Sequence, residues 1–117
     1  MKVHFCLLFS SAKELNDIRL AIHKNGFHLL LEAEEKIYFL SIKDGLLCVI
    51  DKDIPIIGFY FLENRLLILE EAGFYLLDLF GKTIEKKQLD LIENFEINKS
   101  QLHITTYDEG AFTFKLA

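Results

Sequence analysis

Two apolar runs flank a short acidic turn in the segment Leu66-Leu67-Ile68-Leu69-Glu70-Glu71-Ala72-Gly73-Phe74-Tyr75-Leu76-Leu77-Asp78-Leu79. Apolar runs on both sides of a turn that contains glycine indicate a β-hairpin. The same outline recurs in residues 38–50 and 102–116, whose turns are Lys43-Asp44-Gly45 and Tyr107-Asp108-Glu109-Gly110. Repetition at this spacing predicts a stacked and repetitive β architecture.

Antiparallel strands are expected throughout residues 27–116, separated by Pro55, by the glycines and by polar turns. Residues 46–50 and 66–69 are apolar at every position, and a strand without alternation must be covered on both faces. Small sheets that stack face to face, as in propeller blades, provide such cover. Residues 56–62, 65–70, 74–79 and 82–89 therefore predict a four-stranded meander, and residues 92–116 predict a further sheet.

The last two sheets match at an offset of 37 residues, from Gly73 to Gly110, and a propeller blade is about 40 residues long. In the final strand, Phe112 and Phe114 alternate with Thr113 and Lys115, which predicts a terminal sheet with one face in water. Propellers need at least about four blades to close. The sequence holds about three such sheets, which predicts a half-propeller. The alternative is one long, twisted antiparallel sheet wrapped around a helix.

The N-terminal region predicts a strand at residues 3–9 and one helix at residues 12–24. Ser11 and Glu14 form a capping box, apolar residues follow at helical spacing, and Asn25-Gly26 suits a helix C-terminus. On the helix, His23 is expected to be partly exposed. The 117 residues are expected to form a single domain that is mainly β, with this one N-terminal helix.

Charge is distributed unevenly along the chain, whose net charge is −5. Residues 32–81 hold ten acids against four bases, and such a block attracts basic partners and repels phosphate backbones. Cys6 and Cys48 both lie in apolar runs and are expected to be free, buried thiols, although one bridge is an open alternative. The expected location is the cytoplasm.

Catalytic and metal motifs are not recognisable in this sequence. The four histidines lack metal-ligand spacing, and no cofactor-binding loop is present, so we expect no enzyme, no cofactor and no nucleic-acid or membrane partner. A small-molecule hydrolase is a remaining alternative, which would need a cleft that holds His103, Tyr107 and Asp108. His103 otherwise belongs to the wet face of the last sheet.

Acidic residues at the predicted sheet corners are the candidate partner-binding site, because turns project them into solvent. Tyr107, which also lies in a turn, is the best single aromatic anchor. The predicted partner-binding residues are Glu34, Glu35, Asp51, Asp53, Glu70, Glu71, Tyr107, Asp108 and Glu109.

In size, acidity and β-rich texture the chain resembles the immunity proteins of bacterial toxin systems, such as contact-dependent growth inhibition. That resemblance implies a protein that occludes the active site of a basic toxin, commonly a nuclease, with acids in place of nucleic-acid phosphates. The alternative function is a structural or interaction subunit that completes a β-propeller by self-association into a homo-oligomer.

Overall fold

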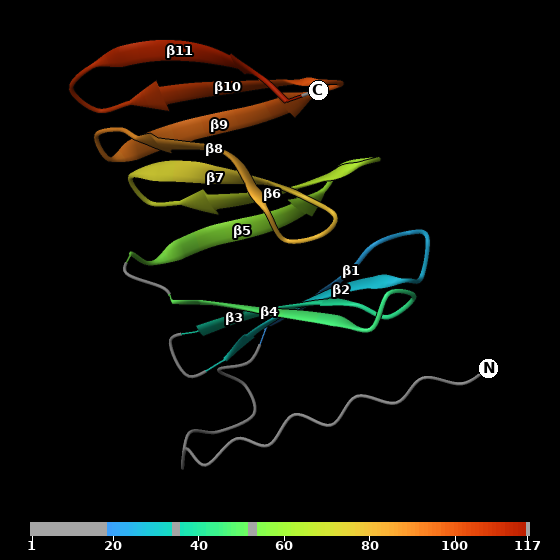
Figure 1. Cartoon of the computed structure of the whole chain (residues 1–117). Coiled ribbons are helices and arrows are strands. Elements are labelled where there is room, and N and C mark those ends of the chain that lie inside the picture. The colour runs from blue at the N-terminus through green and yellow to red at the C-terminus, as the bar shows by residue number, and fades with distance from the viewer. Residues whose placement is uncertain (1–18, 34–35, 52–53, 117) are drawn as a thin grey trace. The chain divides into compact units, whose positions relative to one another are not determined.

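Antiparallel sheets form all of the regular structure in residues 19–33, 36–51 and 54–116, which are the residues that this computed structural model describes (Figure 1). Each sheet pairs strands that are consecutive in sequence. The strands are β1 Arg19–Ile22, β2 His28–Ala33, β3 Lys36–Ser41 and β4 Leu46–Asp51 in the first sheet; β5 Ile56–Phe61, β6 Arg65–Glu70, β7 Gly73–Asp78 and β8 Thr83–Gln88 in the second; and β9 Ile92–Asn98, β10 Gln101–Thr106 and β11 Gly110–Lys115 in the third.

Three separate sheets confirm the prediction of antiparallel meanders. The alternative of one long sheet wrapped around a helix is wrong, and the described residues contain no helix. No helix there is long and apolar enough to cross a membrane. The predicted strand at residues 3–9 lies outside the described residues.

The predicted helix at residues 12–24 is wrong where the structure describes it, and its residues 12–18 lie outside that part. Arg19–Ile22 is a strand paired with β2, in register from Arg19 opposite Glu32 to Ile22 opposite Leu29. Asn25 and Gly26 form the turn of this hairpin: Gly26 has a φ of 76°, and the His23 amide donates to the His28 carbonyl at 2.9 Å. An Asn-Gly pair suits both a helix end and a hairpin turn, and the turn prevails here.

Two compact units make up the chain, and each is described by itself. The first unit contains the sheet β1–β4 together with Leu79–Gly81. Its buried side chains include Leu30 and Phe39, which lie on the same face of the sheet because Leu30 pairs with Phe39 in register. Gly81 packs against that region: a Cβ on Gly81 would lie 2.5 Å from the Cys48 Sγ and 3.5 Å from the Phe39 ring.

The second unit stacks the sheet β5–β8 on the sheet β9–β11 (Figure 1). A shared core of fully buried apolar side chains joins the two sheets: Leu67, Leu69, Phe74, Leu76, Leu102, Ile104 and Leu116. The predicted face-to-face stacking is therefore confirmed for this pair of sheets. The predicted alternation in the last strand is confirmed as well, since Phe112 and Phe114 are partly buried whereas Thr113 and Lys115 are exposed.

Candidate protein-binding surfaces

An acidic rim lies at one end of the second unit, where three loops are joined by backbone hydrogen bonds. The Ile92 amide donates to the Glu71 carbonyl at 2.8 Å, and the Tyr107 amide donates to the Leu91 carbonyl at 3.1 Å. These bonds bring the β6–β7 turn, the β8–β9 connection and the β10–β11 turn together. We define the acidic rim as Glu71, Asp90, Tyr107, Asp108 and Glu109.

Asp90 and Asp108 are acidic-rim residues whose carboxyl groups interact directly. A hydrogen bond that the protonated Asp108 carboxyl group donates to Asp90, followed by the repulsion between the two carboxylates, raises the pKa of Asp108 above its ordinary value. The turn that carries Asp108 is held in shape by Thr106, whose Oγ1 accepts a hydrogen bond from the Glu109 amide at 3.0 Å. A rim whose carboxylates repel one another attracts positively charged groups.

Tyr107 is the most exposed aromatic side chain at the rim, with 64% of its surface accessible. An exposed phenol ring offers an apolar face for contact and a hydroxyl for hydrogen bonding, which is the combination that interface tyrosines use. The predicted residues Glu71, Tyr107, Asp108 and Glu109 are thus brought to one end of one unit.

The remaining predicted residues lie elsewhere. Glu70 is the last residue of β6 and is only 3% exposed, so its expected place in a solvated turn is wrong. The strand continues through Glu70 because it pairs directly with Gly73, which leaves only Glu71 and Ala72 for the turn. Asp51 is exposed at the end of β4, where it accepts a hydrogen bond from Lys36 Nζ at 3.1 Å. Glu34, Glu35 and Asp53 lie outside the described residues.

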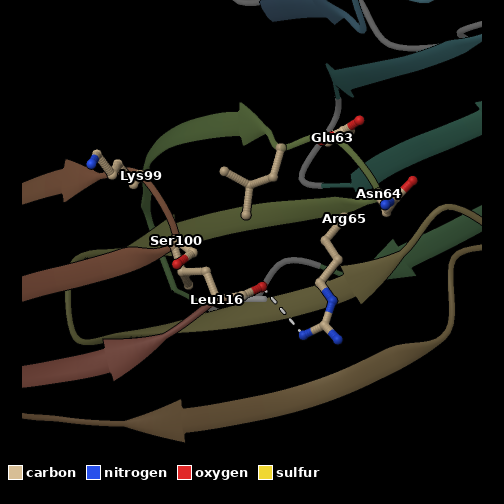
Figure 2. Close-up of a pocket in the computed structure, with 7 residues that line it drawn as sticks. Glu63, Asn64, Arg65, Lys99, Ser100 and Leu116 are labelled. Carbon is tan, nitrogen blue, oxygen red and sulfur yellow. Dashed lines mark hydrogen bonds between the residues drawn. The ribbon is translucent and has the colours of Figure 1, made fainter.

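A pocket of about 520 Å³ opens at the opposite end of the second unit (Figure 2). It lies between the β5–β6 and β9–β10 turns and is lined by Leu62, Glu63, Asn64, Arg65, Lys99, Ser100 and Leu116. Figure 2 shows the Arg65 guanidinium group turned toward the Leu116 carbonyl, to which its Nη1 donates at 3.2 Å. Arg65 and Lys99 outnumber the one carboxylate, so the pocket favours an anionic group.

Sequence reasoning did not find this pocket or Asp90. Arg65 and Lys99 are 34 positions apart, and each alone is an ordinary polar residue at a turn. Lys99 has a φ of 54°, a left-handed conformation that a sequence does not reveal for lysine. One signal in the sequence could have revealed the pocket. Arg65 and Gln101, which begin β6 and β10, are 36 residues apart, so the turns that precede them lie at the same end of their sheets.

The three histidines among the described residues, His23, His28 and His103, occupy two different environments. His23 and His28 are buried in the first unit with ring centroids 5.9 Å apart, so the expected partial exposure of His23 is wrong. Asn25 Nδ2 contacts His28 Nδ1 at 3.0 Å, and burial, followed by repulsion from His23, lowers the pKa of His28. His103 is on the outer face of β10, as predicted, where its Nδ1 contacts Thr113 Oγ1 at 3.0 Å. No three His, Cys, Asp or Glu side chains among the described residues are placed to hold a metal ion.

Comparison with known proteins places the three-sheet arrangement among β-propellers, of which it resembles a part. One similar structure is the N-terminal domain of Nup159, with 24% identity and a TM-score of 0.58 over 94% of this chain. Another is a chain of the S. cerevisiae complex of a Dbp5 variant bound to Nup159, a Gle1 variant, IP6 and ADP, with 21% identity and a TM-score of 0.61 over 96% of this chain. The present chain spans 30% of the length of each.

No protein-family model and no curated protein matches the chain. The structural likeness contradicts the resemblance to toxin-immunity proteins, because the whole described fold matches a propeller domain of a nucleoporin instead. Small size, a net negative charge and a high content of β-strands are shared by unrelated proteins. No sequence motif tied this chain to the immunity class.

Proposed function

We propose that this chain supplies blades of a propeller-like interaction domain, which acts by binding a protein partner and not by catalysis. Support comes from the likeness to the Nup159 N-terminal domain, a protein that the S. cerevisiae structure contains within a larger complex. Since propellers close with at least about four blades and the described residues form three sheets, further blades come from outside these residues.

The proposed binding surface is the acidic rim. It unites three loops from two stacked sheets, and its exposed Tyr107 lies beside Asp108 and Glu109. A basic segment of a partner protein fits this chemistry: its lysines or arginines meet the carboxylates, while an apolar or cationic group packs on the Tyr107 ring. The interaction is expected to weaken as salt concentration rises, because salt screens exposed charges.

The proposal is tested by titrating a lysine-rich peptide into the protein and following backbone amide signals by NMR. Signals from the loops at residues 71–72, 89–91 and 107–109 are expected to shift most. A variant with Asp90→Asn and Glu109→Gln is expected to bind at least about threefold more weakly, in keeping with the modest energy of exposed charge pairs.

The matched control removes two carboxylates away from the rim, with Glu85→Gln on β8 and Glu96→Gln on β9. The control has the same net charge as the rim variant, so it separates a local site from general attraction. Equal weakening by both double variants, or shifts spread evenly over the protein, would contradict the proposed surface.

A further inference from the structure

The turn between β9 and β10 holds a lysine in a backbone conformation that favours glycine. Asn98 pairs with Gln101 in register, so Lys99 and Ser100 alone form the turn, and the φ of Lys99 is 54°. Glycine or asparagine is the usual residue at a positive φ in such a short hairpin turn. A lysine is unfavourable there because its Cβ atom crowds the backbone.

Glycine occupies every other position with a positive φ in the part of the chain that the structure describes. Those positions are Gly26, Gly45, Gly73, Gly81 and Gly110. The chain therefore accepts at Lys99 a strain that it avoids elsewhere. Strained residues of this kind cluster at sites where the side chain has a function, and Lys99 lines the pocket at this end of the second unit.

Arg65 supplies the second positive charge of the pocket, from the start of β6. Its Nη1 donates to the Leu116 carbonyl at 3.2 Å, and its other N–H groups have no hydrogen-bond partner among the described residues. A guanidinium group that is anchored by one bond and has further donors available is suited to bind a carboxylate through two parallel hydrogen bonds.

Two carboxylates lie near Arg65, and neither forms an ion pair with it among the described residues. Figure 2 shows the Glu63 carboxylate turned away from the Arg65 guanidinium group. Asp78 pairs with Arg65 in register, but its Oδ1 accepts a hydrogen bond from the Lys82 amide at 2.9 Å, in the β7–β8 turn. Lys99 lies across the pocket from Arg65 (Figure 2), on a flexible stem that lets its ammonium group follow a ligand.

We propose that this pocket binds a small organic carboxylate with an aliphatic body. Its volume of about 520 Å³ is within the range of about 300–1,000 Å³ that is usual for small-molecule sites. Arg65 and Lys99 bind the carboxylate, while the partly exposed Leu62 and the methylene stems of the two bases contact the aliphatic part. The site lies at the opposite end of the second unit from the acidic rim, so it is independent of the function proposed above.

The test is a titration of the full chain with N-acetyl-L-leucine, followed through backbone amide NMR signals. N-acetyl-L-leucinamide is the matched ligand, because it has nearly the same shape and no charge. The acid is expected to bind with a dissociation constant in the millimolar range, as befits a ligand of this size. Signals of residues 62–65 and 99–100 are expected to shift most, and the amide is expected to bind at least about threefold more weakly.

Lys99→Gly separates binding from folding. Glycine relieves the strained turn, so the melting temperature is expected to stay the same or rise, whereas the dissociation constant of the acid is expected to rise at least about threefold. Lys99→Arg retains the charge and is expected to retain the affinity. Lys87→Gln, on β8, has the same net charge as Lys99→Gly and is expected to leave binding unchanged.

Four outcomes overturn the proposal. One is the absence of any shift at ligand concentrations up to about 50 mM, and another is equal binding of the acid and its amide. A third is a Lys99→Gly protein that binds as tightly as the wild type or melts at a lower temperature. The fourth is binding of inorganic phosphate at least as tight as that of N-acetyl-L-leucine, since the aliphatic part then contributes nothing. The acidic rim is followed by the signals of other loops, so these outcomes leave its own test unaffected.

Discussion

The ring of Phe74 meets the ring of Phe114 edge to face, with centroids 4.9 Å apart and planes at 63°. Phe74 is in β7 and Phe114 is in β11, so this contact joins the two stacked sheets of the second unit. The two residues follow Gly73 by one position and Gly110 by four positions, respectively, and they come from corresponding strands of the repeat. The two sheets of the repeat thus pack against each other through aromatic side chains of corresponding strands.

Phe74→Ala is expected to lower the free energy of unfolding of the second unit by about 3–5 kcal/mol, because a fully buried ring leaves a cavity between the sheets. Urea unfolding measures the loss. Phe112→Ala is the control: Phe112 is only partly buried and stacks on Phe114 at 6.2 Å without entering the shared core. A loss from Phe112→Ala as large as that from Phe74→Ala would contradict this account of the core.

Gly81→Ala is expected to destabilise the first unit for two reasons. The φ of Gly81 is 85°, and the added methyl group would meet the Cys48 Sγ at 2.5 Å. The conformational cost alone is about 1–2 kcal/mol, and the steric contact adds to it by roughly 1–3 kcal/mol. Gly26→Ala separates these effects, because Gly26 has a φ of 76° and nothing within 4 Å of its added methyl group.

Thermal unfolding of the two glycine variants measures the difference. Adding Cys48→Ala to Gly81→Ala is expected to restore part of the lost stability, because the sulfur that the new methyl group meets is removed. Equal destabilisation by Gly81→Ala and Gly26→Ala would show that the contact with Cys48 is unimportant.

Asp90→Asn is expected to return the pKa of Asp108 toward its ordinary value, because Asp90 is the cause of the increase. A carboxyl group with a raised pKa holds its proton more tightly in the folded state than in the unfolded state. Stability therefore falls as pH rises from the ordinary Asp pKa through the raised value. NMR titration of the Asp108 side chain measures the pKa, and Asp90→Asn is expected to flatten this part of the pH–stability curve; an unchanged Asp108 titration would exclude the coupling.

Acidification below about pH 6.5, the ordinary histidine pKa, is expected to destabilise the first unit because the pKa of His28 is lowered in the folded state. The unfolded state then binds the proton more readily, so stability is present above pH 6.5 and is lost as pH falls toward the lowered pKa. Melting temperatures at several pH values measure the slope. His28→Gln is expected to reduce it and His103→Gln to leave it unchanged; the reverse pattern would refute the assignment.

The strands from residue 56 onward were predictable because their apolar runs, glycines and turn acids all indicate the same element boundaries. Gly73 and Gly110 mark the starts of β7 and β11, and the polar sequence of β8 suits its place as an outer strand. The error at β1 arose because apolar residues spaced for a helix also suit a short strand. Asn25-Gly26 did not distinguish the two, since a positive φ at Gly26 serves either structure.

The binding surfaces were less predictable because they depend on which loops meet. Sequence placed Tyr107, Asp108 and Glu109 in one turn, but only the backbone bonds from Tyr107 to Leu91 and from Ile92 to Glu71 join the other loops to it. Glu70 is the last residue of β6, whereas Glu71 is the first residue of the turn. Glu70 is therefore buried, although the sequence predicted that both lie at an exposed sheet corner. Single-residue differences of this kind are set by the length of a turn, and sequence defines turn length poorly.

Each described sheet pairs only strands that follow one another in the chain. Most interstrand contacts thus form between residues close in sequence, and the entropy lost on closing each short loop is small. Proteins rich in local contacts fold faster than β-sandwiches of similar size, whose strands pair across long separations. The hairpin order seen in Figure 1 therefore implies rapid folding, with each meander able to assemble before the sheets stack.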